Sequence, residues 1–279
     1  IDNGINISKH AFYNYNVDSV VLKGNNRVNY YYTFNGLTAT NVIIGDGSYL
    51  ESGSSVGSFH NSNITNLTIG KNVILDSYES SKSAFGSSSL SAAKIENLTI
   101  DSNIPSSGFQ NSGIKTLNIG SNATSIGYSA FKGCSIINTP NISNMDSIGA
   151  SAFDSALLSA DSITIKQGVE IGRYTFRNCN IRDLTLEGNN IVDSDYSFNS
   201  LTATNVTIGD GSVIEASYYN GAFYSSTIEN LTIGKNVTLE TYSNSDSAFG
   251  SKYSTSAAKI ENLTIDSNIP LIGFQYSDI

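Results

Sequence analysis

The stretch AAKIENLTIDSNIP occurs twice, from Ala92 to Pro105 and, letter for letter, from Ala257 to Pro270. The surrounding sequence is duplicated as well, because residues 1–114 correspond to residues 165–279 with one residue inserted in the second copy. A catalytic site rarely needs duplicating, whereas a structural element often does. The duplication therefore indicates a repeat architecture.

A phenylalanine marks a shorter period inside both copies, with gaps of 22 to 26 residues. The twelve members of this series are Phe12, Phe34, Phe59, Phe85, Phe109, Phe131, Phe153, Phe176, Phe198, Phe223, Phe249 and Phe274. A unit this small cannot bury its own apolar residues, so such units stack on one another as a solenoid. We expect one solenoid over 1–279, with about twelve repeats and residues 115–164 linking the two copies.

Most units carry a run such as NLTIG, in which the L-T-I triplet alternates apolar and polar residues as a half-buried strand does. Turn-forming Gly, Asp, Asn and Ser follow each triplet, and Asn is expected to cap the turn before the strand. The predicted three-residue strands lie near 67–69, 98–100, 117–119, 184–186, 231–233 and 263–265. The small residues around SAF predict a single turn of 3₁₀ or α-helix, and Pro140 predicts one irregular coil.

The segments SIGYSAFKGCSII (Ser125 to Ile137) and EIGRYTFRNCNIRDLTLEGN (Glu170 to Asn189) resemble the BspA-type leucine-rich repeat. The resemblance extends over the whole chain, although most units lack the proline that often follows the strand. It implies a curved leucine-rich-repeat stack of short parallel strands. It also implies a bacterial surface or secreted protein that adheres to a host or microbial protein or glycan, although a fold alone does not fix a function.

Composition narrows the classes of partner. The net charge is −9 and no basic stripe exists to neutralise phosphates, so nucleic acid is not expected to bind. No apolar run approaches 18 residues, so we expect no membrane insertion in this segment. The sequence begins and ends inside a repeat, and we interpret it as a piece of a longer extracellular or cell-surface protein whose signal peptide and anchor lie elsewhere.

The sequence offers few candidates for catalytic or metal-binding residues. Cys134 and Cys179 occupy the same position two repeats apart, roughly 10 Å by strand spacing, and are expected to be free buried thiols. His10 and His60 become Tyr174 and Tyr224 in the second copy, so a surface or half-buried structural role is expected. The repeated GDGS is interpreted as an Asp-Gly turn, since calcium needs six to eight oxygen ligands. We expect no metal, cofactor or catalytic residue.

Two groups of residues are candidates for binding. The outward position of each L-T-I triplet forms a ladder of mostly threonine, represented by Thr68, Thr99, Thr232 and Thr264. Tyrosines gather in the loops before the phenylalanine and differ between the copies, represented by Tyr30, Tyr31, Tyr218 and Tyr219. Tyrosine suits recognition because it offers a large contact area with a polar tip, although packing between coils would also explain these rings.

Three functions remain open. The first is a non-enzymatic binding or adhesion module, and the second is a passive stalk that spaces another domain from the cell. The third is a parallel β-helix enzyme acting on carbohydrate, which would need carboxylates and basic residues clustered on one face. The uncharged threonine ladder argues against the third.

Overall fold

The computed structural model describes residues 1–53, 57–78, 81–89, 91–193, 195–216, 221–242, 246–250, 257–270, 273–277 and 279. The chain divides into two compact units, residues 1–140 (unit 1) and 141–279 (unit 2). Each unit is a β-solenoid whose coils pair through parallel strands, so the predicted stack of parallel strands is confirmed. The described residues contain no helix.

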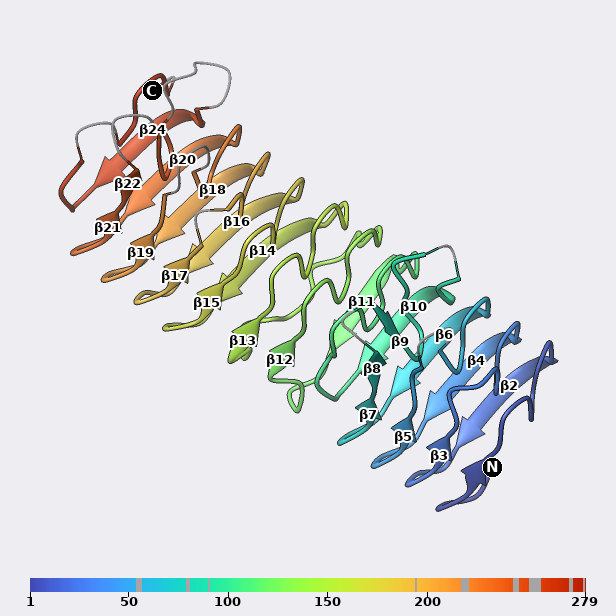
Figure 1. Cartoon of the computed structure of the whole chain (residues 1–279). Helices are drawn as coiled ribbons and strands as arrows, with labels where there is room; N and C mark the ends of the chain where they lie inside the picture. The colour runs from blue at the N-terminus through green and yellow to red at the C-terminus, as the bar shows by residue number, and fades with distance from the viewer. Residues whose placement is uncertain are drawn as a thin grey trace. The chain divides into compact units, whose positions relative to one another are not determined.

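In unit 1, five long strands pair in the order β11-β10-β6-β4-β2, side by side in Figure 1. They are β2 (Asn16–Leu22), β4 (Thr38–Ile44), β6 (Asn63–Ile69), β10 (Lys94–Ile100) and β11 (Thr116–Ile119). The short strands are β1 (Asn6–Ile7), β3 (Arg27–Val28), β5 (Tyr49–Leu50), β7 (Ile74–Leu75) and β12 (Ser125–Ile126). A small antiparallel pair, β8 (Ser77–Tyr78) and β9 (Lys82–Ser83), projects from one coil.

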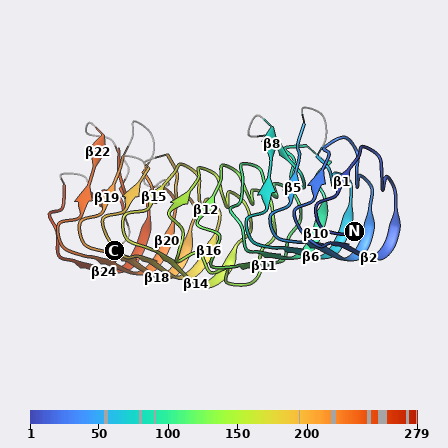
Figure 2. The same cartoon turned by 90° about the horizontal axis from the view of Figure 1, so that it is seen from below.

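In unit 2, the long strands pair in the order β14-β16-β18-β20-β24. They are β14 (Ser159–Ile165), β16 (Asn180–Leu186), β18 (Thr202–Ile208), β20 (Thr227–Ile233) and β24 (Lys259–Ile265). The short strands are β13 (Ser147–Ile148), β15 (Glu170–Ile171), β17 (Ile191–Val192), β19 (Val213–Ile214) and β21 (Thr238–Leu239), with an antiparallel pair β22 (Thr241–Tyr242) and β23 (Asp246–Ser247). Figure 2 shows the long and short strands on different sides of the coils.

The strands occur at the predicted places, but most of the long ones have seven residues instead of three. In β6 the buried residues are Ile64, Leu67 and Ile69, so the alternation is interrupted between Ile64 and Leu67. Thr65 and Asn66 both face outward there, and strict period-two alternation therefore stops at the L-T-I triplet. The three-residue prediction was wrong because it required that alternation throughout.

The phenylalanine series forms the core of each unit. All its members are buried except Phe12 and Phe274, which are partly exposed. Neighbouring rings stack almost parallel, as Phe34 and Phe59 do with centroids 4.6 Å apart. Each ring thus covers the next coil, which explains why the phenylalanine recurs in every repeat.

The turns around these phenylalanines are not helical, contrary to the prediction. Around seven of the phenylalanines in the described part of the chain, left-handed residues stand two positions before and two positions after the ring, as Ser107 (φ 52°) and Asn111 (φ 58°) do around Phe109. A left-handed residue interrupts a right-handed helix after one hydrogen-bonded turn. The segment therefore forms consecutive turns whose free N–H groups bond the next coil, as Phe109 does with the carbonyl of Ala130 at 2.8 Å.

The coil that contains Pro140 is irregular, as predicted, and residues 136–142 form no strand. The side chain of Asn138 replaces the missing partner of β11. Its Oδ1 accepts a hydrogen bond from the N–H of Leu117 at 2.8 Å, and its Nδ2 donates to the carbonyl of Leu117 at 2.9 Å. A side-chain amide thus satisfies backbone groups that a strand would otherwise pair.

Candidate functional site

The outward threonines lie where the sequence places them. Thr68 and Thr99 are exposed neighbours on β6 and β10, and Thr232 and Thr264 are exposed neighbours on β20 and β24. A flat row of hydroxyls offers many weak polar contacts but no pocket of its own. Binding by these threonines stays a prediction.

Beside the threonines runs a ladder of asparagines. In unit 1, Asn66 Nδ2 donates to Asn41 Oδ1, and Asn97 Nδ2 donates to Asn66 Oδ1, both at 3.0 Å. In unit 2, Asn262 and Asn230 continue the same arrangement at 2.9 Å. The expectation that this asparagine caps a turn was wrong, because it lies inside the strand and its amide joins one coil to the next.

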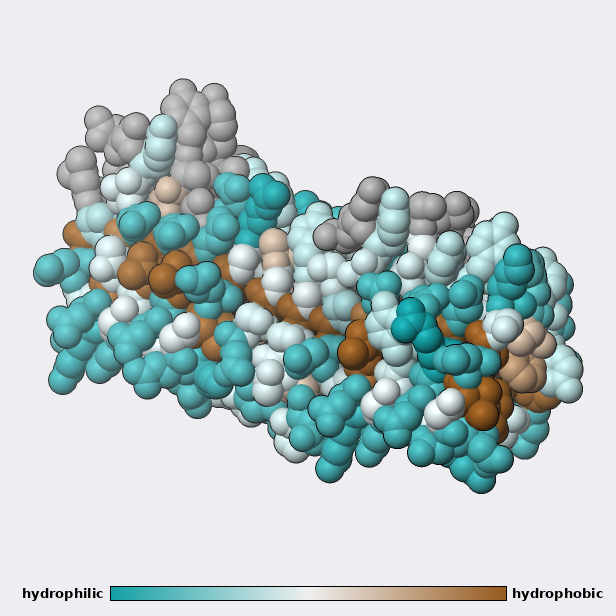
Figure 3. Space-filling model, turned by 60° about the horizontal axis from the view of Figure 1, so that its bottom comes forward, coloured by the Kyte–Doolittle hydropathy of each residue, from teal (hydrophilic) through white to brown (hydrophobic). Residues whose placement is uncertain are grey.

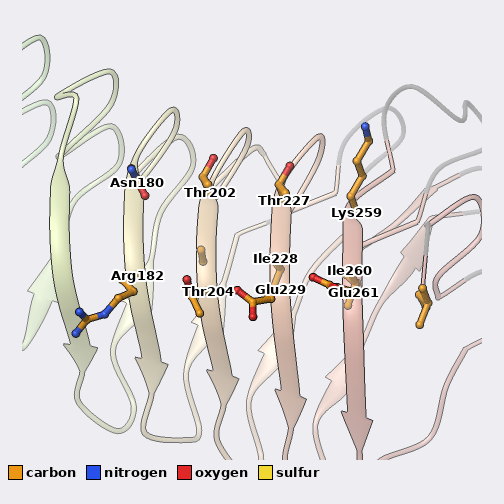
Figure 4. A pocket seen from close by; sticks show the side chains of 12 residues that line it. Asn180, Arg182, Thr202, Thr204, Thr227, Ile228, Glu229, Lys259, Ile260 and Glu261 are labelled. Atoms are coloured by element: carbon orange, nitrogen blue, oxygen red, sulfur yellow. The ribbon is translucent and has the colours of Figure 1, made fainter.

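A hollow of about 740 Å³ in unit 2 lies across the beginning of the long strands (Figure 4). Its polar lining includes Arg182, Thr204, Glu229, Lys259 and Glu261. Figure 4 shows the Glu229 side chain directed toward Thr204, whereas that of Arg182 is directed away from both glutamates. The L-T-I triplets did not predict this groove, because its lining residues precede the last three residues of each strand.

The positive charge that Arg182 brings to the groove is partly neutralised by neighbouring carboxylates. The Arg182 guanidinium lies 3.3 Å from an Asp161 carboxylate oxygen and 3.1 Å from one of Asp183. The hydrogen bonds from Asn205 and Arg182 hold the pKa of Asp183 below its usual range. A smaller hollow of about 290 Å³ lies at the corresponding place in unit 1, lined by residues such as Asp18 and Thr65. Both units therefore have a hollow at this place, but the charged residues that line it differ between the units.

The second candidate is a group of rings in unit 1, which we name the aromatic cluster: His10, Tyr13, Tyr30, Tyr31 and Tyr32. The His10 ring lies 5.7, 5.4 and 5.3 Å from the rings of Tyr13, Tyr31 and Tyr32. Tyr31 also meets Tyr32 at 5.1 Å and Tyr30 at 6.0 Å, edge to face in both cases. Two neighbouring coils thus bring five rings into one surface group.

The cluster stays accessible although its rings support one another. Tyr13, Tyr31 and Tyr30 are 48%, 42% and 36% exposed. Tyr30 also has a packing role, because a β-carbon added at Gly53 would lie only 2.3 Å from its ring. Tyr31 therefore fits the recognition interpretation better than Tyr30 does.

Unit 2 contains a different arrangement at the corresponding positions. Arg177 stands where unit 1 has Tyr13, and its guanidinium lies 4.7 Å from the ring centre of Tyr174. The same guanidinium donates to both oxygens of the buried Asp154, at 2.7 and 2.9 Å. Tyr218 and Tyr219 lie outside the described residues, so their part in binding also stays a prediction.

The remaining polar candidates have structural roles. Both cysteines are free and buried, and burial raises the pKa of both thiols, that of Cys134 to about 12. Asp46 of the GDGS turn accepts a hydrogen bond from the N–H of Lys71 in the next coil at 2.9 Å, as a structural turn residue would. The described residues contain no group of three or more side chains suited to a metal ion.

His60 differs from expectation, because its side chain is completely buried. Its Nε2 lies 3.2 Å from the carbonyl oxygen of Ser83 and 3.3 Å from that of Gly86, so Nε2 carries the proton. Its Nδ1, which then carries no proton, lies 3.4 Å from the hydroxyl oxygen of Ser91. Burial is the main reason that the pKa of His60 falls to about 4.

In the view of Figure 3, brown hydrophobic residues form a broken row with hydrophilic residues on both sides of it. The described part of the chain has no helix that is long and apolar enough to span a membrane.

The chain belongs to the BspA type leucine-rich repeat region family, whose model matches residues 5–138, 78–204 and 146–276 with six copies. The family is generally non-enzymatic and typically surface-associated, and its repeats are of a kind suited to binding proteins. No curated protein and no solved structure matches the chain.

Proposed function

We propose that this chain is a non-catalytic binding module, secreted or held at a cell surface, that adheres to a protein or glycan through the aromatic cluster of unit 1. The observation that carries the proposal is the contrast between the two units. Unit 1 exposes Tyr13 and Tyr31, whereas unit 2 has an ion pair and Asp195 at the corresponding places. Packing of the shared scaffold does not require exposed rings there, and exposed aromatic rings are typical anchors of binding sites.

A binding array of matrix proteins and glycans tests the proposal, comparing the wild type with the double variant Tyr13→Ser/Tyr31→Ser. Tyr128→Ser is the matched control, because Tyr128 is 42% exposed, as Tyr31 is, and lies outside the cluster. Binding lost only in the double variant, with unchanged thermal unfolding, supports the module. Binding that survives the double variant contradicts it.

A variant carrying Tyr218→Ser and Tyr219→Ser tests the other two predicted tyrosines separately. Four further threonine variants, Thr68→Ala, Thr99→Ala, Thr232→Ala and Thr264→Ala, test the outward ladder in the same assay. The Tyr30→Ser variant is measured alone, because loss of its packing on Gly53 would change stability as well as the surface.

A passive spacer is the second candidate. It is favoured by the asparagine ladders and phenylalanine stacks, which join coil to coil and need no ligand. A spacer predicts no binding above background anywhere in the array. An enzyme acting on carbohydrate would instead use the unit 2 groove, and polysaccharide cleavage that disappears in Glu229→Gln or Glu261→Gln would favour it over both.

A further inference from the structure

We propose, on the basis of the function proposed above, that the ligand of the aromatic cluster is a carbohydrate that carries a carboxylate. Three properties of the cluster support this choice: the fixed and accessible rings, the positive charge beside them, and the small extent of the surface.

The rings are held in place before any ligand arrives. The Tyr31 carbonyl accepts a hydrogen bond from the His10 N–H at 3.2 Å, and the His10 carbonyl accepts one from Tyr13 N–H at 3.3 Å. The edge-to-face contacts fix the side chains as well. A sugar ring that packs its C–H face on Tyr31 therefore costs little conformational entropy in the protein, and the tyrosine hydroxyls can bond to the sugar.

The charge beside these rings is positive. Lys9 Nζ lies 5.9 Å from the centre of the Tyr31 ring. In the described part of the chain Lys9 makes no ion pair, although the net charge of the protein is −9. An ammonium group beside exposed rings in an acidic protein favours a ligand that combines an apolar face with a negative charge.

The size of the cluster favours a sugar over a folded protein. Its rings come from two neighbouring coils, and the strands of neighbouring coils lie roughly 5 Å apart. A stable protein interface covers about 800 Å² on each partner, far more than five partly exposed rings provide. One or two sugar rings match the surface.

Titration calorimetry with short oligosaccharides tests the inference. The probes are oligomers of galacturonic acid, oligomers containing glucuronic acid, and sialylated lactose, each compared with its neutral methyl ester. Tyr31→Ser should weaken binding of the best acid by up to about tenfold, which is the upper end of the effect of losing one aromatic stacking contact. Lys9→Gln should weaken it about fivefold and leave the ester unaffected, while Tyr128→Ser should stay within about twofold.

Each other result overturns a different part of the argument. An ester that binds as tightly as its acid refutes the carboxylate. Binding of matrix proteins but no sugar, still lost in Tyr13→Ser/Tyr31→Ser, refutes the carbohydrate while the proposed binding module survives. Absence of any ligand that depends on the cluster refutes both.

Discussion

Stability should fall as the pH is lowered from 7.5 to 5, because His60 is buried as the neutral imidazole. The pKa of His60 is lowered from its usual 6.5 to about 4, mainly by burial, with the Lys82 charge lowering it slightly and the two carbonyl contacts opposing the change. Between these two values the unfolded chain binds a proton that the folded chain does not. The folded state is therefore fully favoured above pH 6.5 and loses stability as the pH falls toward 4.

The magnitude follows from the difference between the two pKa values. A difference of about 2.5 units corresponds to a limit of about 3 kcal/mol at low pH. About 2 kcal/mol of this is already lost at pH 5, where most carboxylates are still ionised. The structural cause is that protonation would place a positive charge on a completely buried ring whose neighbours are backbone carbonyls and a serine hydroxyl, with no carboxylate among the described residues to pair with it.

Urea unfolding between pH 5 and pH 7.5 measures the effect, with His60→Tyr as the matched variant. Tyrosine occupies the corresponding position in unit 2, as Tyr224, so this scaffold accepts it. The variant keeps His10 and every carboxylate, and the difference between the two profiles therefore isolates His60. Parallel profiles for wild type and variant would refute the reasoning.

Three further outcomes are expected in unfolding and labelling experiments. Asn66→Ala should lower the free energy of unfolding by about 1–2 kcal/mol because it breaks two ladder hydrogen bonds, whereas the exposed Asn63→Ala should change it by less than about 0.5 kcal/mol. Arg177→Ala should cost about 2–3 kcal/mol because it leaves the buried carboxylate of Asp154 without its bidentate partner, whereas Arg182→Ala, in an exposed pair, should cost less than about 1 kcal/mol. Both cysteine thiols should react with a disulfide reagent only after unfolding, and a native protein that reacts at once would contradict their burial.

The repeat pattern predicted the solenoid because its signal is periodic and redundant. Every phenylalanine marks one coil, and each L-T-I triplet indicates a strand with one buried face. The beginning of the strands could not be predicted in this way, since Thr65 and Asn66 both face outward and interrupt the alternation. Two-residue strands such as β3 carry no period at all, and only their neighbours in adjacent coils define them.

The candidate sites were less predictable than the fold, because they depend on contacts between coils. Tyr31 was found from the difference between the two copies, but its contact with His10 joins residues about a whole repeat apart. The burial of His60 likewise comes from the chain around Ser83 and Gly86 in the next coil. The groove of unit 2 was missed because its charged residues precede the triplet that marks the strand.

The duplicated stretch shows which properties of a strand depend on its own sequence and which depend on the neighbouring coils. Lys94–Ile100 and Lys259–Ile265 are identical in sequence and are both seven-residue strands, so local conformation follows the local sequence. Leu98 is fully buried, whereas Leu263 is partly exposed, because β10 has long strands on both sides and β24 pairs only with β20 among the described residues. Leu98→Ala should therefore cost about 3 kcal/mol, and Leu263→Ala about half as much or less. Equal losses in urea unfolding of this chain would show that burial by the neighbouring coil does not control the stability of a repeat.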